Sequence, residues 1–230
     1  LINLPISIGD SLGAAAVPSV AASQAMGRYD ELKERICSVV KTVLIVAVPC
    51  AFGLSVLGKP VLRMLFPSSY LGGELFWVGS FAVVFYCINH VATGILQGLN
   101  HPQLPMRHAF IGVAVSCMLN VFFISVLDLN IYSLPLNTLV FSGLLMVLNM
   151  RSAVKLCKVK VNFWNMARIP MLCGTIMACI CLLVYLLLFA LLRSNLCATV
   201  CSVLSGVLAY FVLILYTLFV QTLSLGHLFL

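Results

Sequence analysis

Apolar residues dominate this chain in long stretches that short polar segments separate. A helix that spans a bilayer needs about 20 mostly apolar residues. Seven stretches meet that length, at residues 1 to 22, 38 to 58, 74 to 98, 105 to 127, 132 to 150, 168 to 192 and 197 to 220. The pattern therefore predicts an all-α membrane protein with about seven transmembrane helices.

Glycine and proline mark the ends of several of these stretches. Gly27 follows the first stretch, Pro60 the second and Pro102 the third, and both residue types commonly end helices. Pro49 and Pro135 lie inside predicted helices instead. Each lacks the N–H of a helical hydrogen bond, so we expect a kink at both positions.

Polar residues recur near the end of the stretch from 74 to 98 with helical spacing. Asn89, Thr93, Gln97 and His101 are four residues apart, which places them on one face of a helix. Polar side chains in hydrocarbon lose water without replacement, so this face should turn to other helices or to water. Two interpretations stay open: hydrogen bonds between helices, or one wall of a polar transport cavity.

The first stretch carries a similar polar side, formed by Asn3, Ser7, Asp10 and Ser11. Asp10 is the one carboxylate in the middle of a predicted span, where an ionisable group is costly unless it is paired or hydrated. It is therefore a candidate for ion or proton coupling, unless it is a hydrated or neutral structural carboxyl. Small residues in the same stretch should permit close helix packing: Gly9, Gly13, Ala14, Ala15 and Ala16.

The composition agrees with a chain that is dissolved in lipid. Of its 230 residues, 63% are hydrophobic and 8% are charged, whereas soluble domains are roughly 45 to 50% apolar. Lysine and arginine, which give a net charge of +7, gather at residues 28 to 41, at 107 and from 151 to 168. Because basic residues accumulate in cytoplasmic loops, we expect these three connections and the C-terminus to be cytoplasmic, and the first helix to enter from outside.

The sequence shows no arrangement typical of an enzyme. Asp30, Glu31 and Glu34 alternate with basic residues, and we interpret this segment as a solvated amphipathic turn. The ten cysteines contain no C-x-x-C pair, and we interpret them as small buried hydrophobic residues. We expect no catalytic residue, metal site or cofactor. The chain starts at Leu1 without a signal peptide, so we expect it to begin inside a longer protein.

A series of phrases along the chain resembles one family. It runs from LINLPISIGDSLGAAAVPSVAAS through VPCAFGLSVLGKPVLRMLFP and GILQGLNHPQLP to GVAVSCMLN and LNIYSLPLNTLVFSGLLMVLN. In this order the phrases resemble the stage V sporulation protein B branch of polysaccharide biosynthesis proteins, in the multidrug/oligosaccharidyl-lipid/polysaccharide flippase superfamily. They are more weakly similar to its lipid II flippases. The residues with structural roles in these phrases would be Pro5, Pro18, Pro49, Gly98, Pro105 and Asn120.

The resemblance implies the C-terminal part of a fourteen-helix, two-lobe flippase fold. Residues 1–155 would belong to the second lobe, matching helices 8 to 12 of the family, and residues 156–230 would form two additional helices. The implied function is export of polyprenyl-diphosphate-linked saccharide precursors, for peptidoglycan or polysaccharide synthesis, across the plasma membrane of a bacterium. The implied partners are this substrate, membrane lipids and the N-terminal lobe, without nucleic acid. The substrate cavity would be lined by Asn3, Ser7, Asp10, Ser11, Asn89, Thr93 and Gln97.

Two positions depart from the family, and two further functions stay open. Ser116 stands where the family tends to carry a lysine, and residues 132–135 replace a usual Tyr-Gly-Ala-Ala phrase. A drug or cation antiporter would share the fold but needs a coupling carboxylate, for which Asp10 is the candidate. The chain could also be a truncated remnant that transports nothing.

Overall fold

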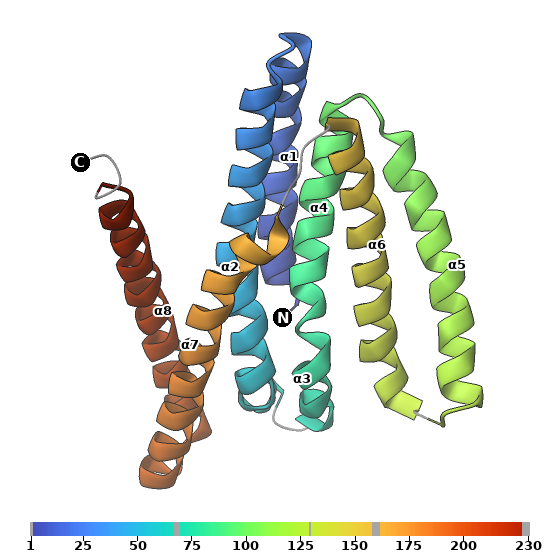
Figure 1. The fold of residues 1–230 in the computed structure, drawn as a ribbon. Coiled ribbons are helices and arrows are strands. Elements are labelled where there is room, and N and C mark those ends of the chain that lie inside the picture. Colours follow the sequence, from blue (N-terminus) through green and yellow to red (C-terminus); the bar gives the residue numbers. More distant parts are fainter. Residues whose placement is uncertain (1, 67–69, 129, 158–161, 227–230) are drawn as a thin grey trace.

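The structure, a computed structural model, describes residues 2–66, 70–128, 130–157 and 162–226. Within these residues it contains α-helices and two short 3₁₀ helices and no strand (Figure 1). In chain order the elements are α1 (Asn3–Ala25), α2 (Tyr29–Leu65), η1 (Tyr70–Leu75), α3 (Phe76–Gly79), α4 (Ala82–Gly98), α5 (Gln103–Ser125), η2 (Asn130–Tyr132), α6 (Ser133–Cys157), α7 (Phe163–Leu192) and α8 (Asn195–Gly226). The predicted all-α fold class is confirmed.

Six helices are long and apolar enough to cross a membrane, namely α1, α2, α5, α6, α7 and α8. The predicted span from 74 to 98 is divided between α3 and α4, and the chain bends there by 49°. If this bent pair is counted as one span, the described residues contain seven spans, as the sequence predicted.

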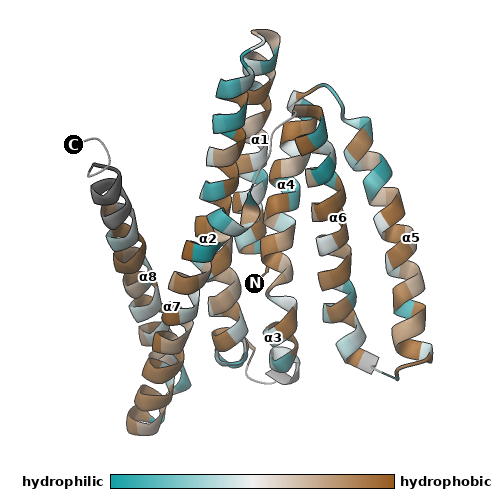
Figure 2. Cartoon of the chain, in the orientation of Figure 1, coloured by the Kyte–Doolittle hydropathy of each residue, from teal (hydrophilic) through white to brown (hydrophobic). Residues whose placement is uncertain are grey.

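The long helices run up and down between two ends of the bundle. The α1–α2 and α4–α5 connections lie at one end, together with the C-terminal end of α6 (Figure 1). The α5–α6 and α7–α8 connections lie at the opposite end. Hydrophilic residues gather at the first of these ends (Figure 2). The α1–α2 connection, the α4–α5 connection and the basic end of α6 therefore share one end (Figure 1), and the side of the membrane that this end faces stays a prediction.

Glycines bring α1 and α4 into backbone contact. Gly9 and Gly13 of α1 face α4, and Gly94 and Gly98 of α4 face α1. A Cβ atom added at Gly13 would lie 2.6 Å from the His90 carbonyl oxygen, and one added at Gly94 would overlap the Gly13 carbonyl oxygen. Both glycine pairs have the G-x-x-x-G spacing that permits close approach of helices in membranes. The close packing predicted for the first stretch is confirmed.

Helix α2 contributes to two apolar clusters. The first cluster joins α2 to α1, α4 and α6, and contains the fully buried Val40, Val91 and Ile95. The second joins α2 to α7 and α8 through residues that include Leu57 and Met177. Because α2 packs on both sides, it connects the helices on either side of residue 155. The proposed boundary at that residue stays a prediction.

Helix α8 is hydrogen-bonded to α2 at the backbone group that Pro49 leaves free. Pro49 lies inside α2, and its missing N–H leaves the Ile45 carbonyl oxygen without its usual helical donor. The Tyr210 hydroxyl of α8 donates to this oxygen at 2.7 Å. The predicted kink at Pro49 stays a prediction, but α2 continues through it as one helix, and the freed carbonyl accepts a bond from another helix.

A second link joins the opposite end of α2 to α7 and α8. Asn195, at the start of α8, donates from Nδ2 to the Pro60 carbonyl oxygen at 3.1 Å. Its Oδ1 accepts from the Tyr185 hydroxyl of α7 at 3.0 Å. One amide side chain therefore connects three helices.

Three local predictions are wrong. The segment interpreted as a solvated turn is helical, because α2 begins at Tyr29 and its alternating charges form pairs three and four residues apart. Pro135 does not kink a helix, because it stands in the first turn of α6, where a missing N–H needs no helical partner. The connection after α4 is also shorter than the gap predicted between residues 98 and 105, since α5 already begins at Gln103.

Candidate transport site

The polar side of α1 is exposed in this chain. Asn3, Ser7, Asp10 and Ser11 all occupy exposed positions. The Ser7 hydroxyl donates to the Leu4 carbonyl oxygen at 2.7 Å, and the Ser11 hydroxyl donates to that of Ser7 at 2.9 Å. Both hydroxyls therefore donate to their own helix, and their oxygens can still accept hydrogen bonds. We refer to the surface that these four residues form on α1 as the polar side.

His90 of α4 is the partner of Asp10. Its Nδ1 contacts Asp10 Oδ1, and the Asp10 and His90 side chains are 56% and 32% exposed. The Tyr86 ring lies 6.5 Å from the His90 ring, measured between centroids. A carboxylate inside a span is usually paired, so Asp10 follows that rule. The sequence did not indicate His90, because it stands one position away from the four-residue stripe of α4.

Asn89 and Thr93 turn toward α6, where they meet Asn149. Asn149 Nδ2 donates to Asn89 Oδ1 at 2.7 Å and lies 3.4 Å from Thr93 Oγ1. Asn149 Oδ1 lies 2.6 Å from His108 Nδ1 of α5, and the ring nitrogen must donate because an amide oxygen only accepts. Asn89 and Asn149 are 8% and 2% exposed. This geometry matches hydrogen bonding between helices, the first interpretation of the stripe.

The rest of the stripe lies apart from this contact. Gln97 is exposed in the last turn of α4, and His101 is exposed beyond the end of the helix. Between them, Asn100 adopts a left-handed conformation with φ of 61°, which asparagine tolerates better than most residues. The structure therefore does not keep Asn89, Thr93 and Gln97 in one environment. Their role as cavity lining stays a prediction.

The positions that carry the family resemblance mostly shape helices. Pro5 stands in the first turn of α1 and Pro18 lies inside the helix, and the Cys87 thiol donates to the Pro5 carbonyl oxygen at 3.4 Å. Gly98 is the last residue of α4 and packs against the Val17 carbonyl oxygen. Pro105 stands in the first turn of α5 and Asn120 further along it.

The departures from the family have structural explanations. Asn137 of α6 donates to the Ser116 hydroxyl of α5 at 2.7 Å, and a lysine could not accept this bond because its ammonium only donates. Pro135 packs against α3, where a Cβ atom added at Gly79 would lie 3.3 Å from the proline Cβ. Both departures therefore lie at contacts between helices.

The ten cysteines are buried, half-buried (Cys37 and Cys50) or exposed. Cys87, Cys157, Cys173 and Cys181 are buried, as predicted. The prediction is wrong for the exposed Cys117, Cys179, Cys197 and Cys201, because an apolar span also presents such residues to lipid. Among the described residues, no group of three or more His, Cys, Asp or Glu is placed to hold a metal ion.

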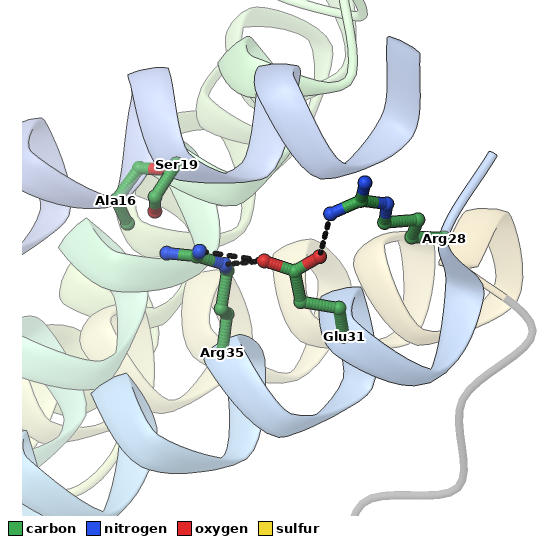
Figure 3. A network of polar contacts seen from close by, with 5 residues as sticks. All are labelled: Ala16, Ser19, Arg28, Glu31 and Arg35. Carbon is green, nitrogen blue, oxygen red and sulfur yellow. Dashed lines mark hydrogen bonds and ion pairs between the residues drawn. The ribbon is translucent and has the colours of Figure 1, made fainter. Parts of the chain in front are cut away.

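An ion-pair network lies at the start of α2, next to the α1–α2 connection (Figure 3). Glu31 accepts from Arg35 at 2.7 Å and from Arg28 at 3.4 Å. These hydrogen bonds, that of Arg35 above all, hold the pKa of Glu31 below its ordinary value. Figure 3 also shows Ser19 of α1, whose hydroxyl donates to the Ala16 carbonyl oxygen at 2.9 Å. The network uses one carboxylate for two guanidinium groups and therefore keeps a net positive charge.

Known proteins resemble the chain over most of its length. A family model described as Lipid II flippase MurJ matches residues 1–207. The chain is 29% identical over 126 residues to the lipid II flippase MurJ of Bacillus subtilis (strain 168), covering 53% of this chain and 23% of that protein. It is 25% identical over 135 residues to the probable lipid II flippase MurJ of Aquifex aeolicus (strain VF5), covering 56% of this chain and 27% of that protein. The chain thus spans about a quarter of the length of these curated relatives.

Proposed function

Because the chain belongs to the family of the lipid II flippase MurJ, we propose that it is part of a transporter that moves a lipid-linked saccharide precursor of the cell wall across the bacterial plasma membrane. The family consists of transporters, so we assign no catalytic step to the chain. Its apolar helices and its family make it a multi-pass bacterial membrane protein.

The exposed polar side of α1 is the observation that carries this proposal. Asn3, Ser7, Asp10 and Ser11 interrupt an otherwise apolar span on a surface that no described helix covers. Polar groups at membrane depth are tolerated where they face protein or water. In the proposed mechanism they face the saccharide-diphosphate headgroup and hydrogen-bond to it. The lipid tail of the substrate stays in the bilayer.

Alternating access gives this surface its role in transport. Two lobes that rock about a central site expose that site first to one side of the membrane and then to the other. The chain would supply part of one lobe, and the polar side of α1 would meet the other lobe. The partners we propose are therefore the N-terminal lobe and the lipid-linked substrate.

The orientation proposed for the chain follows its basic residues. The ends of α1 and α6 and the starts of α2 and α5 would face the cytoplasm, and α8 would end there. Arg151 and Lys155 line an open depression near the end of α6, together with Ser152 and Val154. Basic side chains at a membrane surface attract anionic lipid headgroups, so membrane lipids are a further proposed partner.

The relatives favour a lipid II flippase over an antiporter or an inactive remnant. One curated relative is named a lipid II flippase and the other a probable lipid II flippase, so neither an antiporter nor a remnant is proposed. The narrower resemblance to the stage V sporulation protein B branch, and with it a role in sporulation, stays a prediction.

Replacement of a hydroxyl on the polar side tests the proposal. In the complete protein in liposomes, Ser11→Leu should lower the transport rate of a fluorescent lipid II analogue by about tenfold, the effect of roughly 1.4 kcal/mol. Thr175→Leu is the matched control, because Thr175 of α7 is also exposed and bonded to its own helix through the Met171 carbonyl oxygen. Equal transport by both variants, at equal membrane levels, would reject the polar side as the substrate surface.

A further inference from the structure

We propose that Asp10 and His90 form a proton-binding site whose protonation is linked to the transport cycle. The link to transport rests on the proposed function, but the proton site itself stands on geometry. A carboxylate of α1 and an imidazole of α4 contact each other at membrane depth, on the polar side of the chain. A titratable pair at that depth is a functional candidate.

The contact defines which atom exchanges the proton. His90 Nδ1 lies against Asp10 Oδ1, so the Nδ1–H donates to the carboxylate and the Nε2 atom is the second protonation site. With both ring nitrogens protonated, the imidazolium and the carboxylate sum to zero charge. When the Nε2–H bond breaks, the proton passes to water and the electron pair stays on Nε2. The pair then carries one negative charge, and the Nδ1–H bond to Asp10 is kept.

The location of the pair links this charge to the transport cycle. Asp10 is seven residues beyond the start of α1, which places it about 10 Å along the helix axis. Both side chains are partly exposed, so water reaches them while the polar side is open. When a second lobe covers this surface, loss of water disfavours the negatively charged state. The covered pair therefore holds its proton, and the open pair exchanges it.

The surrounding groups do not supply a competing charge. Among the described residues, the Tyr86 ring lies beside the His90 ring, Cys87 interacts with Asp10, and Cys50 of α2 interacts with Cys87. Tyrosine and cysteine are ordinarily neutral at pH 7. From α6, Phe141 packs against Tyr86, with ring centroids 6.5 Å apart. Among the described residues around the pair, the proton is therefore held by the carboxylate and the imidazole themselves.

A spectroscopic titration tests the proton site without any transport assay. The full chain is labelled with ¹⁵N-histidine in lipid nanodiscs, and the signal that disappears in His90→Gln identifies His90. In Asp10→Asn, the His90 signals and their dependence on pH should differ from those of the unchanged chain, because the ring loses the carboxylate that its Nδ1 contacts. Asp30→Asn, an exposed carboxylate of α2, is the matched control and should change nothing. An unchanged His90 titration in Asp10→Asn would overturn the site.

A second measurement tests the link to transport. In liposomes that hold the complete protein, the rate of lipid II translocation should vary with pH, and His90→Gln should flatten this profile while His101→Gln keeps it. A flat profile for the unchanged protein, or an unchanged profile in His90→Gln, overturns the link. Absence of transport at every pH overturns the proposed function and the link together, whereas the titration alone then decides the proton site.

Discussion

The α1–α4 pair and the α7–α8 pair are both built from two packed helices, but different atoms make the contact. Helices α1 and α4 run in the same direction, and α7 and α8 run in opposite directions (Figure 1). In the first pair, glycines press backbone against backbone. In the second, Gly206 faces the Cys181 thiol, and the Ser202 hydroxyl donates to the Cys181 carbonyl oxygen at 2.6 Å.

The difference indicates how well each helix contact can accommodate an added atom. A side chain can rotate away from an intruding atom, whereas two backbones can only separate. The α1–α4 contact should therefore be intolerant of added volume, and it is the contact that carries the polar side and the Asp10–His90 pair. The α7–α8 contact should be more tolerant, since its close approach involves the end of a side chain.

An alanine at Gly94 should give the largest effect. Its Cβ would overlap the Gly13 carbonyl oxygen, so Gly94→Ala should lower the free energy of unfolding by about 2 to 3 kcal/mol through overpacking. Gly206→Ala should cost about 1 kcal/mol or less, because the Cys181 thiol can move. Unfolding in mixed detergent micelles by sodium dodecyl sulfate measures both values.

Gly53→Ala provides the control for this series. A Cβ at Gly53 would meet Met177 at 3.7 Å, an ordinary contact, and alanine favours a helix over glycine by up to about 1 kcal/mol. This variant should be as stable as the unchanged chain or more so. Equal losses at Gly94 and Gly206 would contradict the distinction between the two contacts.

Removal of the Asn149 side chain tests whether the polar contact next to α4 is structural. Asn149→Leu leaves Asn89 and His108 without their partner and should cost about 1 to 2 kcal/mol of unfolding free energy. Asn120→Leu is the matched control in α5, because the Asn120 amide oxygen is buried and has no hydrogen-bond partner among the described residues. Its stability should stay the same or rise, and an equal loss in both variants would argue against the hydrogen bonds.

A smaller effect should come from the Tyr210 hydroxyl that anchors α8. Tyr210→Phe removes its bond to the Ile45 carbonyl oxygen and should cost about 0.6 kcal/mol, the average for such bonds in membranes. Pro49→Ala restores a helical donor for the same oxygen. The cost of Tyr210→Phe should therefore shrink in the Pro49→Ala background, and a double-mutant cycle measures this. Independent, additive costs would show that the proline is not the reason for the bond.

The smallest effect should come from Glu31 at the start of α2. Hydrogen bonds from Arg35 and Arg28 hold its pKa below 4.5, so its ion pairs stabilise the helix end above that pH and are lost as the pH falls through the lowered value. Glu31→Gln should speed hydrogen exchange in the first turns of α2 at pH 6 but not in strong acid. Glu34→Gln, which removes an exposed carboxyl three residues away, should have a weaker effect at both pH values.

The spans were predictable from the sequence because each one is a local property of about twenty residues. Apolar length alone located α1, α5, α6, α7 and α8 to within a few residues at most ends. The same criterion missed the first turns of α2, because its charged residues form a helix outside the apolar window. It also missed the bend between α3 and α4. The sequence contains no proline at this bend, and Gly79 at the end of α3 is its one helix-ending residue.

The candidate site was predictable only one helix at a time. Spacing indicated the polar side of α1 and the stripe of α4, but pairing between helices depends on contacts across long distances in the sequence. The partner of Asp10 is 80 positions away and that of Asn89 is 60 positions away. His90 and Asn149 belong to no four-residue repeat, so only the packing of α1, α4 and α6 identifies them.

The small and polar residues of α1 have a consequence for how the protein enters the membrane during synthesis. Helix α1 has the lowest hydropathy of the six candidate spans, and its aspartate raises the free energy of its insertion into the membrane. The glycines and the histidine that would hold α1 in place lie on α4, whose residues are synthesised some seventy positions later. We therefore expect α1 to be stably inserted only after α4 has entered the bilayer. The polar side would then be assembled late in the biogenesis of the protein.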